Sequence, residues 1–466
     1  MVMGMHKILA FAISLIMTSV ASAEPPVIHS MTDISQEFSF YMDGRFHRQY
    51  IKELGRDARN WGSLHLADLD NINLLVLGGG NHRIPYRPET VAHIRSFVEG
   101  GGAVLLMADQ GKDMLPAQVV VEGFDAKFSN VSAVKPARGV GDLGEMDITF
   151  RGGKVLELGD EWETLIVDKK NQPLMASRSF GKGRVLLGSR GLFGRKPDAS
   201  DPINAEWITP MLVKATSTKK IDTRRKPRRN WVEHKRELGP LTLEYHEGTE
   251  KYVDQIAAEY NAVRPHLVEI TGVEPSPGML KRLLILPTGG GGFSSGVLIA
   301  IGAWWGNYPE QRYPMVELVA HEAGHSWVLP YAEPLWNEPI ATYLGIQVGD
   351  RMGMPRAQET LQRQLAKGRR TDPDYTKIDP LGPKASRDLI WGKSYYVFEQ
   401  LEEEHGPGAL AKYFKTKRSV LKPGREGYSM DDCVAVWSLA VGEDLFPWFR
   451  SLAFDVDRER TDLPAP

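Results

Sequence analysis

The feature that most constrains this chain is MVELVAHEAGHSW at residues 315–327, where two histidines stand four positions apart. Apolar residues recur along one side of the stretch and no proline interrupts it before Pro330, so it predicts an α-helix. Residues four apart lie on one face of a helix, with their β-carbons about 6 Å apart. His321 and His325 can therefore direct both imidazoles at a single cation.

A second helix is predicted for LWNEPIATYLGIQV at residues 335–348, with Asn337 as its N-cap and Pro339 in its first turn. Glu338 then lies near the start of this helix and faces back toward the two histidines. Glu333, in the turn between the helices, is the alternative acid. Catalytic zinc usually takes three protein ligands and keeps one position open. The sequence thus predicts one Zn²⁺ ion held by both histidines and Glu338.

Glu322 completes the HEXXH pattern, because it directly follows the first histidine. It projects about 100° away from the ligand face, so it cannot easily bind the same ion. It can instead take a proton from water that the metal activates and pass it to a leaving nitrogen. We therefore predict Glu322 as the general base of a peptide-bond hydrolase.

Four further residues are candidates for supporting roles. Tyr395, Tyr396 and Tyr343 are candidates to donate a hydrogen bond to an oxyanion, although a core or rim tyrosine is the favoured interpretation of each. Glu317 lies one turn before His321 and could orient that ring, or it could be a solvated surface glutamate.

The composition limits which functions are possible. The 466 residues suffice for two or three domains. The single cysteine, Cys433, excludes an intrachain disulfide and a cysteine-rich zinc site, so a metal requires His, Asp or Glu ligands. A formal net charge of −2 gives no reason to expect a nucleic-acid partner.

Residues 1–23 have the pattern of a signal peptide. Lys7 precedes an apolar run from Ile8 to Val20, and small residues precede a cleavage site expected after Ala23. The run is shorter than the ~20 residues that span a bilayer. We therefore predict a periplasmic or secreted protein without a membrane anchor.

The mature chain divides into two domains by pattern. In residues 24–213, LLVLGGG and GGAVLLM surround a helical pattern that starts at Pro88, which predicts a βαβ unit. Residues 214–240 are basic and contain proline, and are predicted as a solvated linker; a patch for acidic glycans or a cell surface is the alternative. Residues 241–466 are predicted to be mainly helical, with strands such as RLLILPT before the histidine motif.

The motifs HEAGHSW and WNEPIATYLG resemble the gluzincin metallopeptidases, in which the third zinc ligand is a glutamate in an NEGFA-Y-like segment. Residues 241–456 are most similar to the enhancin-like peptidases, through EITG, FSSGVLIAIG, FEQLEEEHG and SLAVGEDLFPWF. This resemblance implies an α+β, mainly helical, thermolysin-like catalytic domain. It also implies glycoprotein substrates of the mucin type.

The N-terminal half resembles class I glutamine-amidotransferase-like domains, which implies a flavodoxin-like α/β fold. Active members carry a cysteine after a central strand, and this half has none. The resemblance therefore implies a scaffold or binding role for it.

Together these patterns predict an exported zinc peptidase that acts on a peptide or glycoprotein. One alternative is an aminopeptidase of the gluzincin class, although GAWWGN at residues 302–307 lacks the glutamate of the GAMEN-type strand that holds a free amino group. The other is a non-catalytic surface-binding protein with a degenerate peptidase fold. The sequence gives no indication of the oligomeric state.

Overall fold

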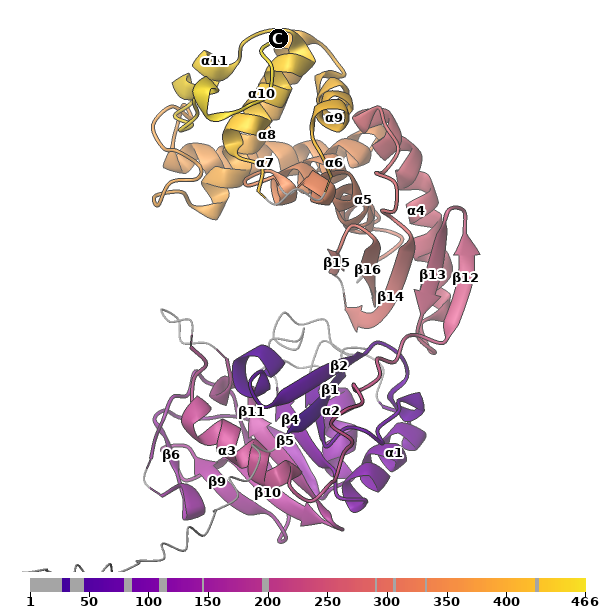
Figure 1. Cartoon of the computed structure of the whole chain (residues 1–466), viewed down its shortest axis with the longest axis vertical. Helices are drawn as coiled ribbons and strands as arrows, with labels where there is room; N and C mark the ends of the chain where they lie inside the picture. The colour runs from indigo at the N-terminus through magenta and orange to yellow at the C-terminus, as the bar shows by residue number, and fades with distance from the viewer. Residues whose placement is uncertain are drawn as a thin grey trace, which may run out of the picture.

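The computed structural model describes residues 27–33, 46–78, 86–108, 115–144, 146–194, 201–289, 291–304, 307–331, 333–423 and 427–466. The predicted signal peptide, residues 1–23, lies outside these ranges and stays a prediction. Within them the protein is a mixed α/β structure with one large sheet, a second sheet and many helices (Figure 1). None of the described helices has the length and apolar character needed to cross a bilayer.

The described residues from 27 to 216 form the first lobe. It is built on a nine-stranded sheet in the order β2-β1-β3-β4-β11-β10-β9-β6-β7. Its strands are β1 (Ile28–Asp33), β2 (Gly55–Asn60), β3 (Leu74–Gly78), β4 (Ala103–Ala108), β6 (Ala137–Gly139), β7 (Asp147–Ile148), β9 (Glu163–Val167), β10 (Pro173–Phe180) and β11 (Gly183–Ser189). The five strands from β2 to β11 are parallel, and those from β10 onward are antiparallel. A separate ladder pairs β5 (Ala126–Ser132) with β8 (Lys154–Leu158).

Helices cover both faces of this sheet. They are α1 (Pro88–Glu99), α2 (Leu115–Glu122) and α3 (Ala205–Thr216). Leu74 and Val76 of β3 belong to the apolar cluster that contains Trp207 of α3. Leu75, on the opposite face of the strand, packs in the cluster that contains Phe97 of α1. Burial on both faces explains why this strand is a continuous apolar run, and the predicted unit β3-α1-β4 is confirmed.

The described residues from 234 to 466 form the second lobe. It begins with a five-stranded sheet in the order β12-β13-β14-β16-β15. Its strands are β12 (His234–Leu238), β13 (Leu241–Tyr245), β14 (Arg282–Gly289), β15 (Gly292–Ser294) and β16 (Leu298–Trp304). β15 is the last strand in the order and runs antiparallel to β16. Helix α4 (Glu250–Thr271) packs on the sheet and ends at Gly272, whose positive φ of 66° is the left-handed conformation that glycine tolerates.

The rest of this lobe is helical, as the sequence predicts. Its α-helices are α5 (Tyr313–Val328), α6 (Asn337–Arg351), α7 (Pro355–Thr371), α8 (Arg387–His405), α9 (Ala409–Val420), α10 (Met430–Val441) and α11 (Phe446–Ser451). Short helices are η1 (His47–Ile51), η2 (Leu64–Leu66), η3 (Gly141–Leu143) and η4 (Arg190–Leu192) in the first lobe, and η5 (Leu329–Tyr331) and η6 (Arg458–Arg460) in the second.

The segment predicted as a solvated linker, residues 214–240, is more structured than expected. Helix α3 extends into it, strand β12 lies within it, and residues 217–233 connect the two. Asn71 of the first lobe binds this connection through its side chain: Nδ2 donates to the carbonyls of Asp222 and Arg225 at 3.2 and 2.9 Å, and Oδ1 accepts from the amide of Asp222 at 2.8 Å. The connection therefore lies along the first lobe.

A fully buried ion pair fixes the turn between α5 and α6. Glu333, just after η5, pairs with Lys417 of α9, and neither side chain is exposed to solvent. The hydroxyl of Tyr413 also donates to Glu333 Oε1 at 2.7 Å. The turn is thereby attached to α9, which follows it by many residues in the chain.

Replacing Lys417 with Met should lower the free energy of unfolding by about 3–5 kcal/mol, because it leaves the carboxylate of Glu333 buried without its cation. Urea denaturation measures this. The matched double variant Lys417→Met/Glu333→Gln removes both charges and should recover much of the loss. Equal losses in the single and double variants would contradict the account.

Candidate metal centre

Helices α5 and α6 approach each other closely through glycines. A β-carbon at Gly324 of α5 would lie 3.2 Å from Leu344 Cδ1 and 3.5 Å from Ala341 Cα, both on α6. A β-carbon at Gly345 of α6 would lie only 2.7 Å from the backbone oxygen of Glu317 on α5, which is closer than real contacts allow. The glycine inside the histidine helix, which costs about 1 kcal/mol relative to alanine, therefore admits a neighbouring helix.

The close approach brings three ligand atoms together. His321 Nε2 lies 3.2 Å from His325 Nε2. Glu338, in the first turn of α6, places Oε2 3.6 Å from His321 Nε2 and Oε1 3.4 Å from His325 Nε2. Bonds of ~2.0–2.1 Å at tetrahedral angles put the ligands of a zinc ion about 3.4 Å from one another. The three side chains therefore fit a His₂Glu zinc site, and they are the one group among the described residues whose ligand atoms lie close enough together to hold a metal ion.

Neighbouring oxygens orient the two imidazole rings. Thr342 Oγ1 lies 3.1 Å from His321 Nδ1 and donates its own proton to the carbonyl of Glu338 at 3.0 Å, so it accepts from Nδ1–H. Asn337 Oδ1, which can only accept, lies 3.2 Å from His325 Nδ1. Both Nε2 atoms therefore carry a lone pair that points at the ligand cluster.

Burial keeps these rings neutral. It lowers the pKa of His321 to about 3, with a smaller contribution from the neighbouring His325 ring. Burial also lowers the pKa of His325, against the opposing effect of the Glu338 carboxylate. The side chain of Glu338 is 53% exposed, so the cluster opens to solvent on that side.

Glu322 lies beside the ligands without joining them. Its Oε1 is 4.0 Å from His321 Nε2, and its side chain is almost fully buried. Burial, and then the negative charge of Glu338, raise the pKa of Glu322 to about 8. Positive charge held at the ligands opposes this shift. Strand β15 covers the residue, because a β-carbon at Gly292 would lie 3.0 Å from both Cγ and Oε1 of Glu322.

Of the three predicted tyrosines, Tyr395 interacts with Thr342, which contacts the His321 ring, and the other two lie against residues outside the cluster. Tyr343 lies on α6 but its hydroxyl donates to Glu399 at 2.5 Å. Tyr395 is fully buried and its ring packs against Tyr343, with 5.7 Å between centroids. Tyr396 packs against Tyr375 at 5.0 Å. Among the described residues, no hydrogen bond joins any of the three to the metal-ligating side chains.

The contacts of the histidines also differ from those predicted. Thr342, rather than Glu317, contacts the His321 ring; Glu317 is largely buried, and burial raises its pKa. Asn337 is the first residue of α6 instead of its N-cap, and its side chain contacts His325. Thr342 stands four residues after Glu338, so helical spacing alone would have placed it on the ligand face.

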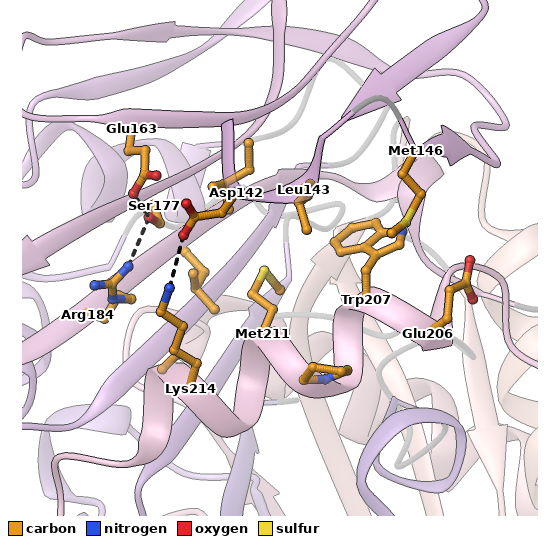
Figure 2. Close-up of a pocket in the computed structure, with 14 residues that line it drawn as sticks. Asp142, Leu143, Met146, Glu163, Ser177, Arg184, Glu206, Trp207, Met211 and Lys214 are labelled. Atoms are coloured by element: carbon orange, nitrogen blue, oxygen red, sulfur yellow. Dashed lines mark hydrogen bonds and ion pairs between the residues drawn. The ribbon is translucent and has the colours of Figure 1, made fainter. Parts of the chain in front are cut away.

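A separate pocket of about 290 Å³ lies in the first lobe between α3 and the sheet (Figure 2). Trp207, Met211 and Leu143 give it an apolar lining. Two of its cations have partners: Lys214 pairs with Asp142 at 3.1 Å, and Arg184 donates to Ser177 Oγ at 3.2 Å. This arrangement supplies no metal-ligating group, so the chemistry points to the His₂Glu cluster instead.

The chain is similar only at a low level to the proteins of known structure that follow. No protein-family model matches the chain, and no curated protein matches it. Among solved structures, the mmIFT52 N-terminal domain is 12% identical over 42% of this chain and 99% of its own, with a TM-score of 0.33. Native yeast LTA4 hydrolase is 16% identical over 46% of this chain and 38% of its own, also with a TM-score of 0.33.

An M1 zinc metallopeptidase from Deinococcus radiodurans is likewise 16% identical, over 50% of this chain and 52% of its own, with a TM-score of 0.33. The match thus spans less than two thirds of either hydrolase. Likenesses of this size assign neither an activity nor a family to the chain.

Replacing Thr342 with Val should weaken zinc binding by about 10- to 100-fold, because His321 loses the oxygen that fixes its tautomer. Competition with a chromophoric chelator measures the affinity. Thr342→Ser keeps the hydroxyl and should bind zinc as the wild type does. Wild-type affinity in the valine variant would rule out the orienting role.

Proposed function

We propose that this protein is a zinc-dependent peptidase. One observation carries the proposal: two imidazole nitrogens with inward lone pairs and a carboxylate converge within 3.2–3.6 Å of one another. No proton lies between the two Nε2 atoms, so their closeness is repulsive unless a cation binds there. Two nitrogens, one oxygen and an open side are the donor set of catalytic zinc.

The order of the strands supports a flavodoxin-like fold for the first lobe. Taken in chain order, the five parallel strands of the first lobe are arranged 2-1-3-4-5, which is the flavodoxin-like order. This supports the resemblance of that half to amidotransferase-like domains. Cys433, the one cysteine, is buried in α10 of the other lobe, which supports a non-catalytic role for the first lobe. The sheet, paired α5–α6 helices and helical remainder of the second lobe support a gluzincin-like catalytic domain.

The residues around the site have distinct roles in the proposed reaction. A bound zinc ion supplies positive charge that polarises a carbonyl and makes water acidic at neutral pH. Glu322 accepts the proton of the attacking water and returns it to the leaving nitrogen. Thr342 and Asn337 hold the two imidazoles in the tautomer that exposes Nε2. The buried walls around Glu322 limit water on that side, while the exposed side of Glu338 admits substrate.

Strand β15 provides a binding surface for an extended peptide. It is paired with β16 on one side only among the described residues, and Gly292 lies directly beside Glu322. An extended peptide can add to the edge strand of a sheet through main-chain hydrogen bonds. A peptide bound in this way passes the base in mid-chain, which supports an endopeptidase. Glycoprotein substrates stay a prediction from the enhancin-like resemblance.

Glu322→Gln should retain one zinc ion and reduce hydrolysis by at least about 10²-fold, because the proton acceptor is lost while the ligands remain. Metal analysis and cleavage of a fluorogenic peptide library measure the two effects. Unchanged cleavage would contradict the mechanism. Absence of both zinc and cleavage in the wild type would favour the non-catalytic binding protein.

A peptide with an acetylated amino terminus should be cleaved at a rate similar to that of the free peptide, since residues 302–307 lack the glutamate expected to hold a free amine. Mass spectrometry of the products locates the cuts. Cleavage confined to the free peptide, one residue from its start, would favour the aminopeptidase instead.

A further inference from the structure

Strand β15 lies between the two lobes. Neighbouring residues of a strand point to opposite faces, so Gly292 and Phe293 face different partners. Gly292 lies against Glu322, as described above. The ring of Phe293 packs on Trp61, which directly follows β2 in the first lobe, with 5.6 Å between centroids. A residue of the first lobe therefore contacts the strand that covers the proposed base.

Trp61 is itself held firmly. Its indole is 8% exposed and stacks on Trp231, with 6.1 Å between centroids and nearly parallel planes. The guanidinium of Arg282, on β14, lies 4.5 Å from the centre of the Trp231 ring. The Trp61 side chain belongs to an apolar cluster that also contains Leu284 of β14, so the lobes share buried surface at this point.

The segment that joins the lobes also contacts the first lobe beside Trp61. The amide of Trp61 donates to the carbonyl of Asn230 at 2.8 Å, and the amide of Ser63 donates to Glu233 Oε1 at 3.0 Å. A β-carbon at Gly62 would lie 2.4 Å from the Trp231 carbonyl oxygen, so the two backbones approach as closely as glycine permits. Strand β12 begins at the residue after Glu233. The segment 230–233, which contacts the first lobe, therefore leads directly into β12 of the second sheet.

The two lobes also meet away from the aromatic cluster. Arg87, which precedes α1, forms an ion pair with Glu247, which follows β13. In Figure 1, β1 and β2 lie on the side of the first lobe that faces the sheet carrying β14 and β16. The placement of Trp61 against Phe293 is therefore fixed by several independent contacts.

We propose that Trp61 is a positioning residue for peptide hydrolysis, and that the first lobe holds the substrate-binding strand in place through it. The proposal rests on the proposed peptidase function and on β15 as its binding edge. β15 has only three residues and, among the described parts of the chain, pairs with β16 on one side, so side-chain packing contributes to keeping its backbone ordered. Without the indole, the Phe293 ring loses its packing on Trp61, and the edge beside Glu322 loosens while the ligands remain in place.

The test uses the full-length zinc-loaded enzyme and an internally quenched peptide with blocked ends. Trp61→Ala should raise KM about five- to tenfold, the range expected for losing an aromatic pair, with a smaller change in kcat and one zinc ion retained. Trp61→Phe should restore most of the loss. Trp162→Ala, which removes a similarly buried indole elsewhere in the first lobe, is the matched control and should leave KM unchanged. An equal rise in KM in the control would overturn the proposal.

A double-mutant cycle separates support from general stability. If Trp61 acts through Phe293, then Trp61→Ala/Phe293→Ala should match the weaker-binding single variant, and additive losses would overturn the proposal. Phe293→Ala alters an edge strand and leaves the first lobe intact, so it serves even if Trp61→Ala does not fold.

Hydrogen exchange measures the order of β15 and β16 independently of peptide cleavage. Amides of residues 292–304 should exchange faster in the zinc-loaded Trp61→Ala or Phe293→Ala protein than in the wild type. Unchanged exchange there overturns the positioning role. Faster exchange in a protein whose wild type cleaves no peptide would support the contact while refuting peptidase activity.

Discussion

Helices α5 and α6 pack with a glycine from each in the interface, and the metal-ligating cluster depends on that close approach. The backbone of α6 lies against Gly324, and the backbone oxygen of Glu317 occupies the space beside Gly345. A side chain at Gly345 would collide with that oxygen and push the helices apart, whereas a β-carbon at Gly324 would press on the Leu344 side chain. Because Glu338 is in the first turn of α6, the same shift would withdraw it from the histidines on α5. Packing at the glycines is thus what converts two helices into a three-ligand site.

Glu333 and Glu338 lie near this helix pair, and their different burial determines whether each carboxylate can bind a metal ion. Glu333 has no exposed surface and is neutralised by Lys417, so its charge is already compensated. Glu338 is half exposed and has two neutral imidazoles as its neighbours, so its charge is available to a cation. A buried carboxylate needs a partner within the protein, whereas an exposed one at a cluster of lone pairs can bind an ion. The ion pair also fixes the turn that precedes Glu338.

The two lobes are connected more tightly than their separate sheets suggest. The connecting segment is bound by Asn71 and lies beside Trp61 before it enters β12. Phe293 then brings the first lobe into contact with the strand that covers Glu322. Under the proposed function, the first lobe would act on the reaction through the geometry of this edge strand, without a catalytic residue of its own.

The sequence by itself determined the local structure and the chemistry of the ligands. Helical spacing placed His321 and His325 on one face, and apolar runs bounded by glycine identified β3, α1 and β4, because these signals depend only on near neighbours. Only the tertiary structure decided which side chains complete the site. Thr342 rather than Glu317 contacts His321, and Tyr343 donates to Glu399, because the side of a helix that meets a neighbour depends on packing between distant segments. The contact between Trp61 and Phe293 joins separate lobes, so no local pattern encodes it.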